Sequence, residues 1–123
     1  MERKEFPCNS EGMVAAQAFL ESWCPEPKPG IIMDEVVSNI VRCSGAESFS
    51  ITLDRPADGS LSMEFTDDGK PFDPTTEVST PDVTASLEDR QLGGLGMFMV
   101  RKMSRSVSYR RTDDGRNVLH VVI

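Results

Sequence analysis

An acidic residue and an amide lie one helical turn apart in this chain, at Glu35 and Asn39. Side chains four residues apart share one face of an α-helix, so both can act on the same ligand. An amide oxygen can coordinate Mg²⁺, which prefers oxygen ligands, and the carboxylate is then free to accept a proton from an attacking hydroxyl. Arg42, three residues farther on, can reach the same phosphate groups. Taken alone, the pattern also fits a solvated helix face.

A second candidate group is the carboxylate of Asp67, which follows an alternating apolar and polar segment and precedes Gly69. A glycine here lets the backbone turn and approach a ligand closely, because no Cβ stands in the way. The carboxylate can then accept a hydrogen bond from an exocyclic amine. An ordinary Asp-Asp-Gly turn is the alternative. Phe72 is either a ligand contact or a core anchor for the loop that follows.

A third motif, Gly93-Gly94-Leu95-Gly96, comes directly before a segment with helical spacing. Unpaired amides and the positive end of the helix dipole suit phosphate oxygens at such a place. The motif matches neither the six-residue dinucleotide fingerprint nor a loop ending in Gly-Lys-Ser/Thr. A purely structural glycine turn is the alternative. In this order and spacing, the three motifs together predict a nucleotide pocket.

Composition limits the classes of function that the chain can have. Its 123 residues suggest one domain, and 20 acidic against 13 basic residues give a formal charge of −7, so no nucleic-acid or anionic-lipid partner is expected. Three widely spaced cysteines argue against a disulfide framework or a zinc site. No apolar run approaches the roughly 18 residues of a membrane span, and the first residues lack a signal-peptide pattern. The expected compartment is the cytoplasm.

The motifs must be positioned by helices and strands that the apolar pattern predicts. Helical spacing begins at Ser10 and ends before prolines at 25, 27 and 29; it resumes near Gly30, stops at Ser44-Gly45, and returns over 95–103. Strands are expected over 5–8, 49–53, 61–65, 106–111 and 117–123, with turns at 56–59 and 113–115. This order predicts an α+β fold with helices covering one face of a mostly antiparallel sheet.

Taken jointly, Glu35-x-x-x-Asn39, Asp67-x-Gly69 and Gly93-Gly94-Leu95-Gly96 resemble the N, G1 and G2 boxes of the GHKL (histidine-kinase-like) ATPase superfamily. Pro-Phe-Asp-Pro at 71–74 and the glycine motif are most similar to bacterial anti-sigma-factor serine/threonine kinases. The resemblance implies a single domain over 1–123. It also implies a two-layer α/β sandwich of the Bergerat type, with a mixed, mostly antiparallel sheet, three helices on one face and an ATP lid at about 70–92.

The resemblance implies ATP and Mg²⁺ as cofactors, and a role for each matching position. Asn39 would hold Mg²⁺, and Glu35 would be the base toward a protein serine or threonine hydroxyl. Asp67 would bind the adenine amine, and Gly69 would permit its close approach. The expected nucleotide site is completed by Arg42, Phe72, Gly93, Gly94, Leu95 and Gly96, of which the last four would surround the phosphates.

The implied function is an ATP-dependent protein serine/threonine kinase that acts as an anti-sigma-factor-type switch. Its acceptor would be a STAS-type anti-anti-sigma protein, whose phosphorylation decides whether a sigma factor is sequestered. The alternative is a non-catalytic ATP-gated module that holds a sigma factor or another regulator. A homodimer is a further expectation, because related kinases often form one. A histidine-kinase catalytic domain and a gyrase-like ATPase are disfavoured, since neither a phosphoacceptor helix nor room for a transducer domain is evident.

Two positions depart from the family pattern. The family often has a histidine four residues after the magnesium asparagine, where this chain has Cys43. A threonine is common in the last strand near the adenine carboxylate, and the position expected to match is His120. In the non-catalytic alternative, these departures mark weakened catalysis.

Overall fold

The computed structural model describes residues 1–56, 58–73 and 95–123, and the described elements follow the predicted order. The strands are β1 (Glu2–Pro7), β2 (Ser48–Asp54), β3 (Ser62–Asp67), β4 (Ser106–Arg111) and β5 (Asn117–Val122). The helices are α1 (Ser10–Glu21), α2 (Pro27–Cys43) and α4 (Leu95–Met103).

The strands form one five-stranded sheet in the order β1-β2-β3-β5-β4. Every pairing between the described strands is antiparallel, where the sequence had suggested a mixed, mostly antiparallel sheet. The pairing of β3 with β5 joins segments that lie far apart in the chain, and it sets Asp67 directly opposite Asn117. The end of β3 and the start of β5 therefore meet at one end of the sheet.

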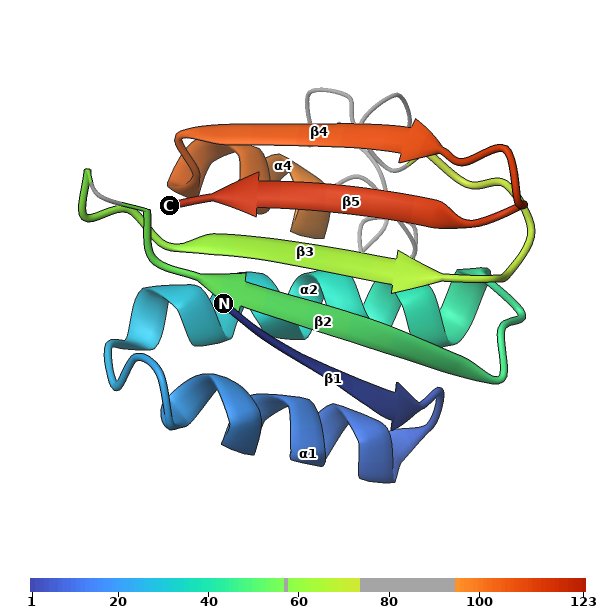
Figure 1. Ribbon diagram of the computed structural model, residues 1–123, viewed down its shortest axis with the longest axis horizontal. Helices are drawn as coiled ribbons and strands as arrows, with labels where there is room; N and C mark the ends of the chain where they lie inside the picture. Colours follow the sequence, from blue (N-terminus) through green and yellow to red (C-terminus); the bar gives the residue numbers. More distant parts are fainter. Residues whose placement is uncertain (57, 74–94) are drawn as a thin grey trace, which may run out of the picture.

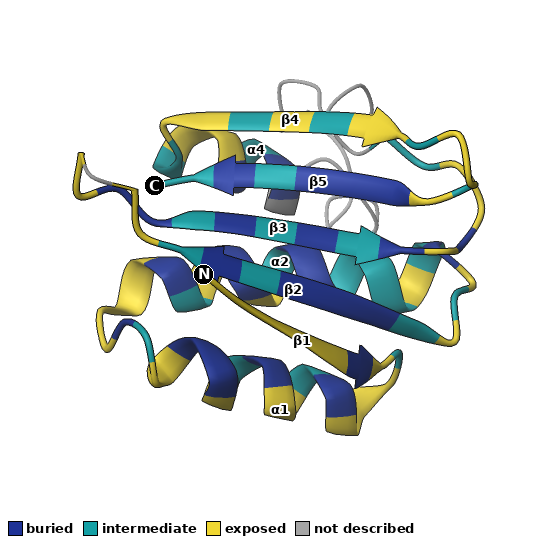
Figure 2. Ribbon diagram, viewed as in Figure 1, coloured by how far each residue is buried: buried dark blue, intermediate teal, exposed yellow. Residues whose placement is uncertain are grey.

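All three described helices cover the same face of the sheet, as predicted (Figure 1). The central strands β2, β3 and β5 carry most of the buried residues of the sheet, while the edge strands β1 and β4 are largely exposed (Figure 2). Phe49, Ile51 and Leu53 alternate along β2 and are almost completely buried. They pack in one core with buried helix residues such as Val36 and Val37. This packing fixes which side of α2 remains available for a site.

The start of three elements shows how local chemistry and strand pairing modify the predicted pattern. Helix α1 is capped by Asn9, because its Oδ1 atom accepts a hydrogen bond of 3.0 Å from the Gly12 amide. Helix α2 begins at Pro27 rather than near Gly30, since prolines fit the first helical turn, where amides have no partner within the helix. Strand β1 begins at Glu2 rather than at residue 5, because it pairs with β2 along its whole length.

The end of α2 is fixed by contacts to the segment after β3. The helix stops at Cys43, as predicted, and Gly45 takes a φ of +70°, which glycine adopts without strain. The carbonyl oxygen of Ser44 accepts a hydrogen bond of 2.9 Å from the Lys70 amide. This bond links the end of α2 to the turn that carries the second motif.

The expected lid at about 70–92 lies outside the described residues from position 74 onward, as do Gly93 and Gly94. None of the described helices has the length and the apolar character that crossing a bilayer requires.

The cap of α1 gives a test of the fold. We expect Asn9→Ala to lower the free energy of unfolding by about 1 kcal/mol, because the Gly12 amide loses its acceptor. Ser10→Ala is the matched control and should cost less than about 0.5 kcal/mol, as is usual for surface changes. Urea denaturation followed by circular dichroism measures both. A larger loss for Ser10→Ala than for Asn9→Ala would contradict this assignment of the cap.

Candidate nucleotide site

Helix α2 brings the first motif to an open cavity beside the sheet. Val36 and Ile40 form part of the cavity wall, and Asn39 lies between them on the lining. The Oδ1 atom of Asn39 accepts a hydrogen bond of 3.0 Å from the Arg42 guanidinium. Glu35 is half-buried one turn earlier and lies outside the cavity lining. The helix thus carries an amide at the cavity and an acid next to it, as predicted from their spacing.

Asp67 ends β3 and is a buried acid with only 6% of its surface exposed. Its Oδ1 atom accepts hydrogen bonds from the Gly69 amide at 2.9 Å and from the Asn117 side chain at 3.0 Å. The Oδ2 atom accepts no hydrogen bond from the described residues, although Asp67 lines the cavity. One carboxylate oxygen is therefore fixed by the protein, and the other remains as an acceptor for a ligand.

The requirement for glycine at position 69 comes from the protein itself. A Cβ atom at Gly69 would lie 2.2 Å from the carbonyl oxygen of Ser44, which is far inside van der Waals contact. The sequence had suggested that Gly69 allows a ligand to approach closely. The structure shows that the close approach is made by the end of α2, which packs against the turn after β3.

The partner of Asp67 in the last strand is Asn117, a residue that the sequence analysis missed. Asn117 lines the cavity, is only 5% exposed and donates from Nδ2 to Asp67 and to the carbonyl oxygen of Lys70, at 3.0 and 2.8 Å. Its Oδ1 atom accepts hydrogen bonds from Tyr109, Arg111 and the Phe72 amide. Its place two residues after Gly115 and at the start of an apolar strand was the available signal.

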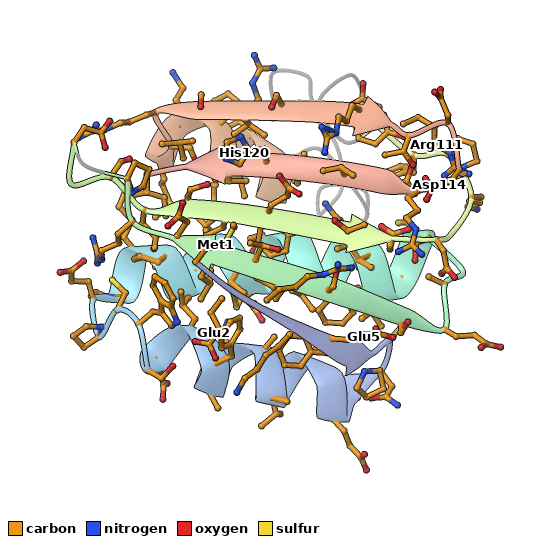
Figure 3. The ribbon with its side chains drawn as sticks, in the orientation of Figure 1. Met1, Glu2, Glu5, Arg111, Asp114 and His120 are labelled. Atoms are coloured by element: carbon orange, nitrogen blue, oxygen red, sulfur yellow. The ribbon has the colours of Figure 1, made fainter. Side chains whose placement is uncertain are left out.

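The expected match at His120 is wrong in position. His120 pairs with Glu64 in the sheet, three residues from the Asp67–Asn117 pair, and so lies on the opposite face of β5. Its Nε2 atom is 2.7 Å from the Ser62 hydroxyl. In Figure 3, His120 lies on β5 far from the end of the sheet where Arg111 is labelled. His120 is therefore separate from the cavity.

The cavity combines apolar walls with a few polar groups. This composition is typical of a small-molecule pocket. Phe72 belongs to the wall, which is where a residue that contacts the ligand must lie. The lining consists of Val36, Asn39, Ile40, Ser44, Phe65, Asp67, Phe72, Met97, Tyr109, Asn117 and Leu119.

The start of α4 also approaches the cavity. The helix begins at Leu95, at the end of the predicted glycine motif, and Met97 in its first turn lines the pocket. For Leu95 and Gly96 the structure describes the backbone only. A helix start next to a cavity provides amide groups and a positive dipole end for an anionic group.

The negative charges near the cavity affect the pKa of a nearby thiol, that of Cys8. Burial raises the pKa of Cys8 above its ordinary value, a hydrogen bond with Ser44 opposes the increase, and the negative charges of Asp67 and Asp68 raise it further. The Cys8 thiol therefore stays protonated at neutral pH.

Among the described residues, no group of three or more histidines, cysteines or acids is arranged to hold a metal ion.

Comparison with known proteins identifies the family. A model of the histidine kinase-like ATPase domain matches residues 10–123. The chain belongs to this family. Membership in a family of ATPase domains implies that the chain binds ATP.

The chain is also similar to individual proteins. It is 33% identical over 84 residues to the serine/threonine-protein kinase BtrW of Bordetella bronchiseptica, covering 65% of this chain and 58% of that kinase. Its fold resembles a chain of the SiaB–SiaC complex from Pseudomonas aeruginosa, with a TM-score of 0.67, 15% identity and coverage of 100% and 89% of the two chains.

A more distant fold match is the histidine kinase domain of the blue-light activated histidine kinase EL346 from Erythrobacter litoralis. The TM-score is 0.52 at 12% identity, and the match covers 95% of this chain and 60% of that one. At such low identities, both structural matches support the fold only.

The contact between Gly69 and Ser44 can be tested by substitution. Gly69→Ala should lower the free energy of unfolding by about 2 kcal/mol or more, because its Cβ would overlap the Ser44 carbonyl oxygen. The exposed neighbour Asp68 provides the control, and Asp68→Ala should change stability by less than about 0.5 kcal/mol. Equal stability of the two variants in a denaturant titration would show that the turn adapts without cost.

Proposed function

We propose that this chain is an ATP-dependent protein serine/threonine kinase of the anti-sigma-factor type. The observation that carries the proposal is the cavity between Asp67 and Asn39, where a buried acceptor lies at one side and a side-chain amide, a group type that Mg²⁺ accepts as a ligand, lies at another. The similarity to a protein named as a serine/threonine kinase supports the same activity.

The cavity suits the two parts of a nucleotide in different ways. An adenine ring would be buried among the apolar walls while its amine donates to the free oxygen of Asp67. The phosphates would extend toward Asn39 and the start of α4, where backbone amides and the helix dipole attract negative charge. We assign Gly93, Gly94, Leu95 and Gly96 to this phosphate end, and Arg42 to its α2 side.

The residues at the phosphate end are compatible with Mg²⁺. The Asn39 Oδ1 atom, which accepts a hydrogen bond from Arg42 in this structure, would become one ligand after Arg42 turns to the phosphates. The other ligands would be phosphate oxygens and water, as is usual for Mg²⁺ bound with a nucleotide. When bound, the ion would offset the negative charge of the phosphates.

Glu35 is proposed as the general base. Its place one turn before Asn39 puts a half-buried carboxylate next to the phosphate end but outside the base-binding cavity. The carboxylate would take the proton of a serine or threonine hydroxyl as that oxygen bonds to the terminal phosphorus and ADP leaves.

The proposed acceptor is a STAS-type anti-anti-sigma protein, and the proposed output is the release or sequestration of a sigma factor in the cytoplasm. The resemblance of the three motifs to anti-sigma-factor kinases supports this assignment. A homodimer is part of the same proposal.

A second candidate function is a non-catalytic, ATP-gated module that holds a sigma factor or another regulator. It is favoured by Cys43, which occupies the position where the family often has a histidine for phosphate contact. The two candidates differ in one observable, because only the kinase transfers phosphate to its partner.

Phosphotransfer tests the role of Glu35. Glu35→Gln should keep ATP affinity and slow phosphorylation of a STAS-type protein from the same genome by about 100- to 10,000-fold, because the proton acceptor is lost. Asp34→Asn, an exposed neighbouring acid on α2, is the matched control and should keep the wild-type rate. Radiolabelled ATP and quantified phosphoprotein give the rates. Undiminished transfer by Glu35→Gln would exclude Glu35 as the base, and ATP-dependent capture without phosphoprotein would favour the second candidate.

Calorimetric titration tests the nucleotide site itself. We expect wild-type protein to bind ATP more tightly with Mg²⁺ than without it, and Asn39→Ala to reduce the Mg²⁺-dependent affinity at least about tenfold. Ser38→Ala, one residue earlier on α2, should bind as wild type does. If wild-type protein bound no ATP, the cavity would not be a nucleotide site, and the fold would serve protein contact instead.

A further inference from the structure

The side chain of Asn117 has its amide orientation fixed by its neighbours. The Phe72 backbone amide and the Arg111 guanidinium can only donate, and they lie 3.4 and 3.1 Å from Oδ1. The Lys70 carbonyl can only accept, and it lies 2.8 Å from Nδ2. Reversing the amide would place donor against donor and acceptor against acceptor. The Nδ2 group must therefore face Asp67.

Tyr109 and Arg111 of β4 hold the Asn117 amide in this orientation by donating to its oxygen, on the side of the amide away from Asp67. The Tyr109 hydroxyl donates to Oδ1 of Asn117 at 2.5 Å, and Tyr109 itself lines the cavity. Arg111 donates through Nη1 both to Oδ1 and to the Gly69 carbonyl oxygen, at 3.1 and 2.8 Å. The positively charged guanidinium polarises the Asn117 carbonyl and makes its NH₂ group a stronger donor.

The consequence reaches Asp67. Both of its hydrogen bonds from the protein end on Oδ1, so the plane of the carboxylate is set by Gly69 and Asn117 together. No described residue donates to Oδ2, which makes this atom an acceptor without a competing donor. An acceptor of this kind favours a base with an exocyclic amine and disfavours one with a carbonyl oxygen at the same place, since two acceptors repel each other.

We propose that Asn117, held by Tyr109 and Arg111, is a positioning residue that sets the selectivity of the site for an amino-substituted purine. It acts through Asp67 and does not contact the base. The inference rests on the proposed function, because it assumes that Asp67 binds the base of a nucleotide.

The test compares the affinities for ATP and for inosine triphosphate, in which a carbonyl replaces the exocyclic amine of adenine. Asn117→Val removes the donor to Asp67, and Asn117→Thr is its near-isosteric match that restores a hydroxyl donor. We expect the valine variant to lose about 10- to 100-fold in ATP affinity, with little change for inosine triphosphate. The threonine variant should recover most of the wild-type ratio.

Tyr109→Phe provides a milder variant that removes a single hydroxyl. It should lower the ratio of the two affinities by about 2- to 10-fold, because Arg111 and the Phe72 amide still hold Asn117. Thermal melts establish that each variant is folded. If the valine variant does not fold, the ratio measured for Tyr109→Phe decides, and an unchanged ratio would overturn the proposal.

The outcomes separate this inference from the proposed function. Equal losses of both affinities in Asn117→Val, an unchanged ratio, or a threonine variant that behaves like valine would each overturn the positioning role while leaving an ATP site in place. Absence of ATP binding by the wild-type protein would overturn both proposals.

Discussion

The burial of the Asp67 carboxylate is the constraint on which the site depends. A charged group moved out of water is costly unless donors replace the lost hydration, and here they are the amide of Gly69 and the side chain of Asn117. The first donor requires a tight turn directly after β3. The second requires β5 to lie beside β3, although a helix and another strand intervene in the chain. The acid therefore connects local turn geometry with the topology of the sheet.

The same turn determines where the other half of the site lies. Gly69 packs against Ser44, and the Lys70 amide donates a hydrogen bond to the Ser44 carbonyl oxygen. These two contacts hold the end of α2 against the turn. The inner side of α2 is buried in the core through Val36 and Val37, so the rotation of the helix is fixed as well. Asn39 is thus placed at the cavity by hydrophobic packing on one side of its helix and by a backbone contact at its end.

The contributions that could be predicted from sequence are those encoded locally. Apolar periodicity located the helices, and alternation located the strands. The motifs around Asn39 and Asp67 pointed to residues that line one cavity, whereas Glu35 lies outside its lining. The missed cap at Asn9 reflects two adjacent residues that can both cap a helix, Asn9 and Ser10, and only the backbone geometry distinguishes them.

Asn117 could not be identified from local sequence patterns, because its role depends on the register between β3 and β5. These strands are not joined by a hairpin, so no turn length specifies which residue lies opposite Asp67. A difference of three positions, from His120 to Asn117, changes both the face of the sheet and the end of the strand. Long-range register is set by packing of the whole core, which a linear pattern does not contain.

The negative net charge of the chain opposes the binding of an anionic ligand at long range. With a formal charge of −7, the protein repels a nucleotide triphosphate at long range, and screening at physiological salt limits this repulsion to about 8 Å. In the proposed site, binding would therefore come from short-range features: a buried acceptor for the base, apolar walls, and a helix start for the phosphates. All three are features of backbone and packing rather than of net charge, so a strongly acidic chain can still hold an anionic ligand.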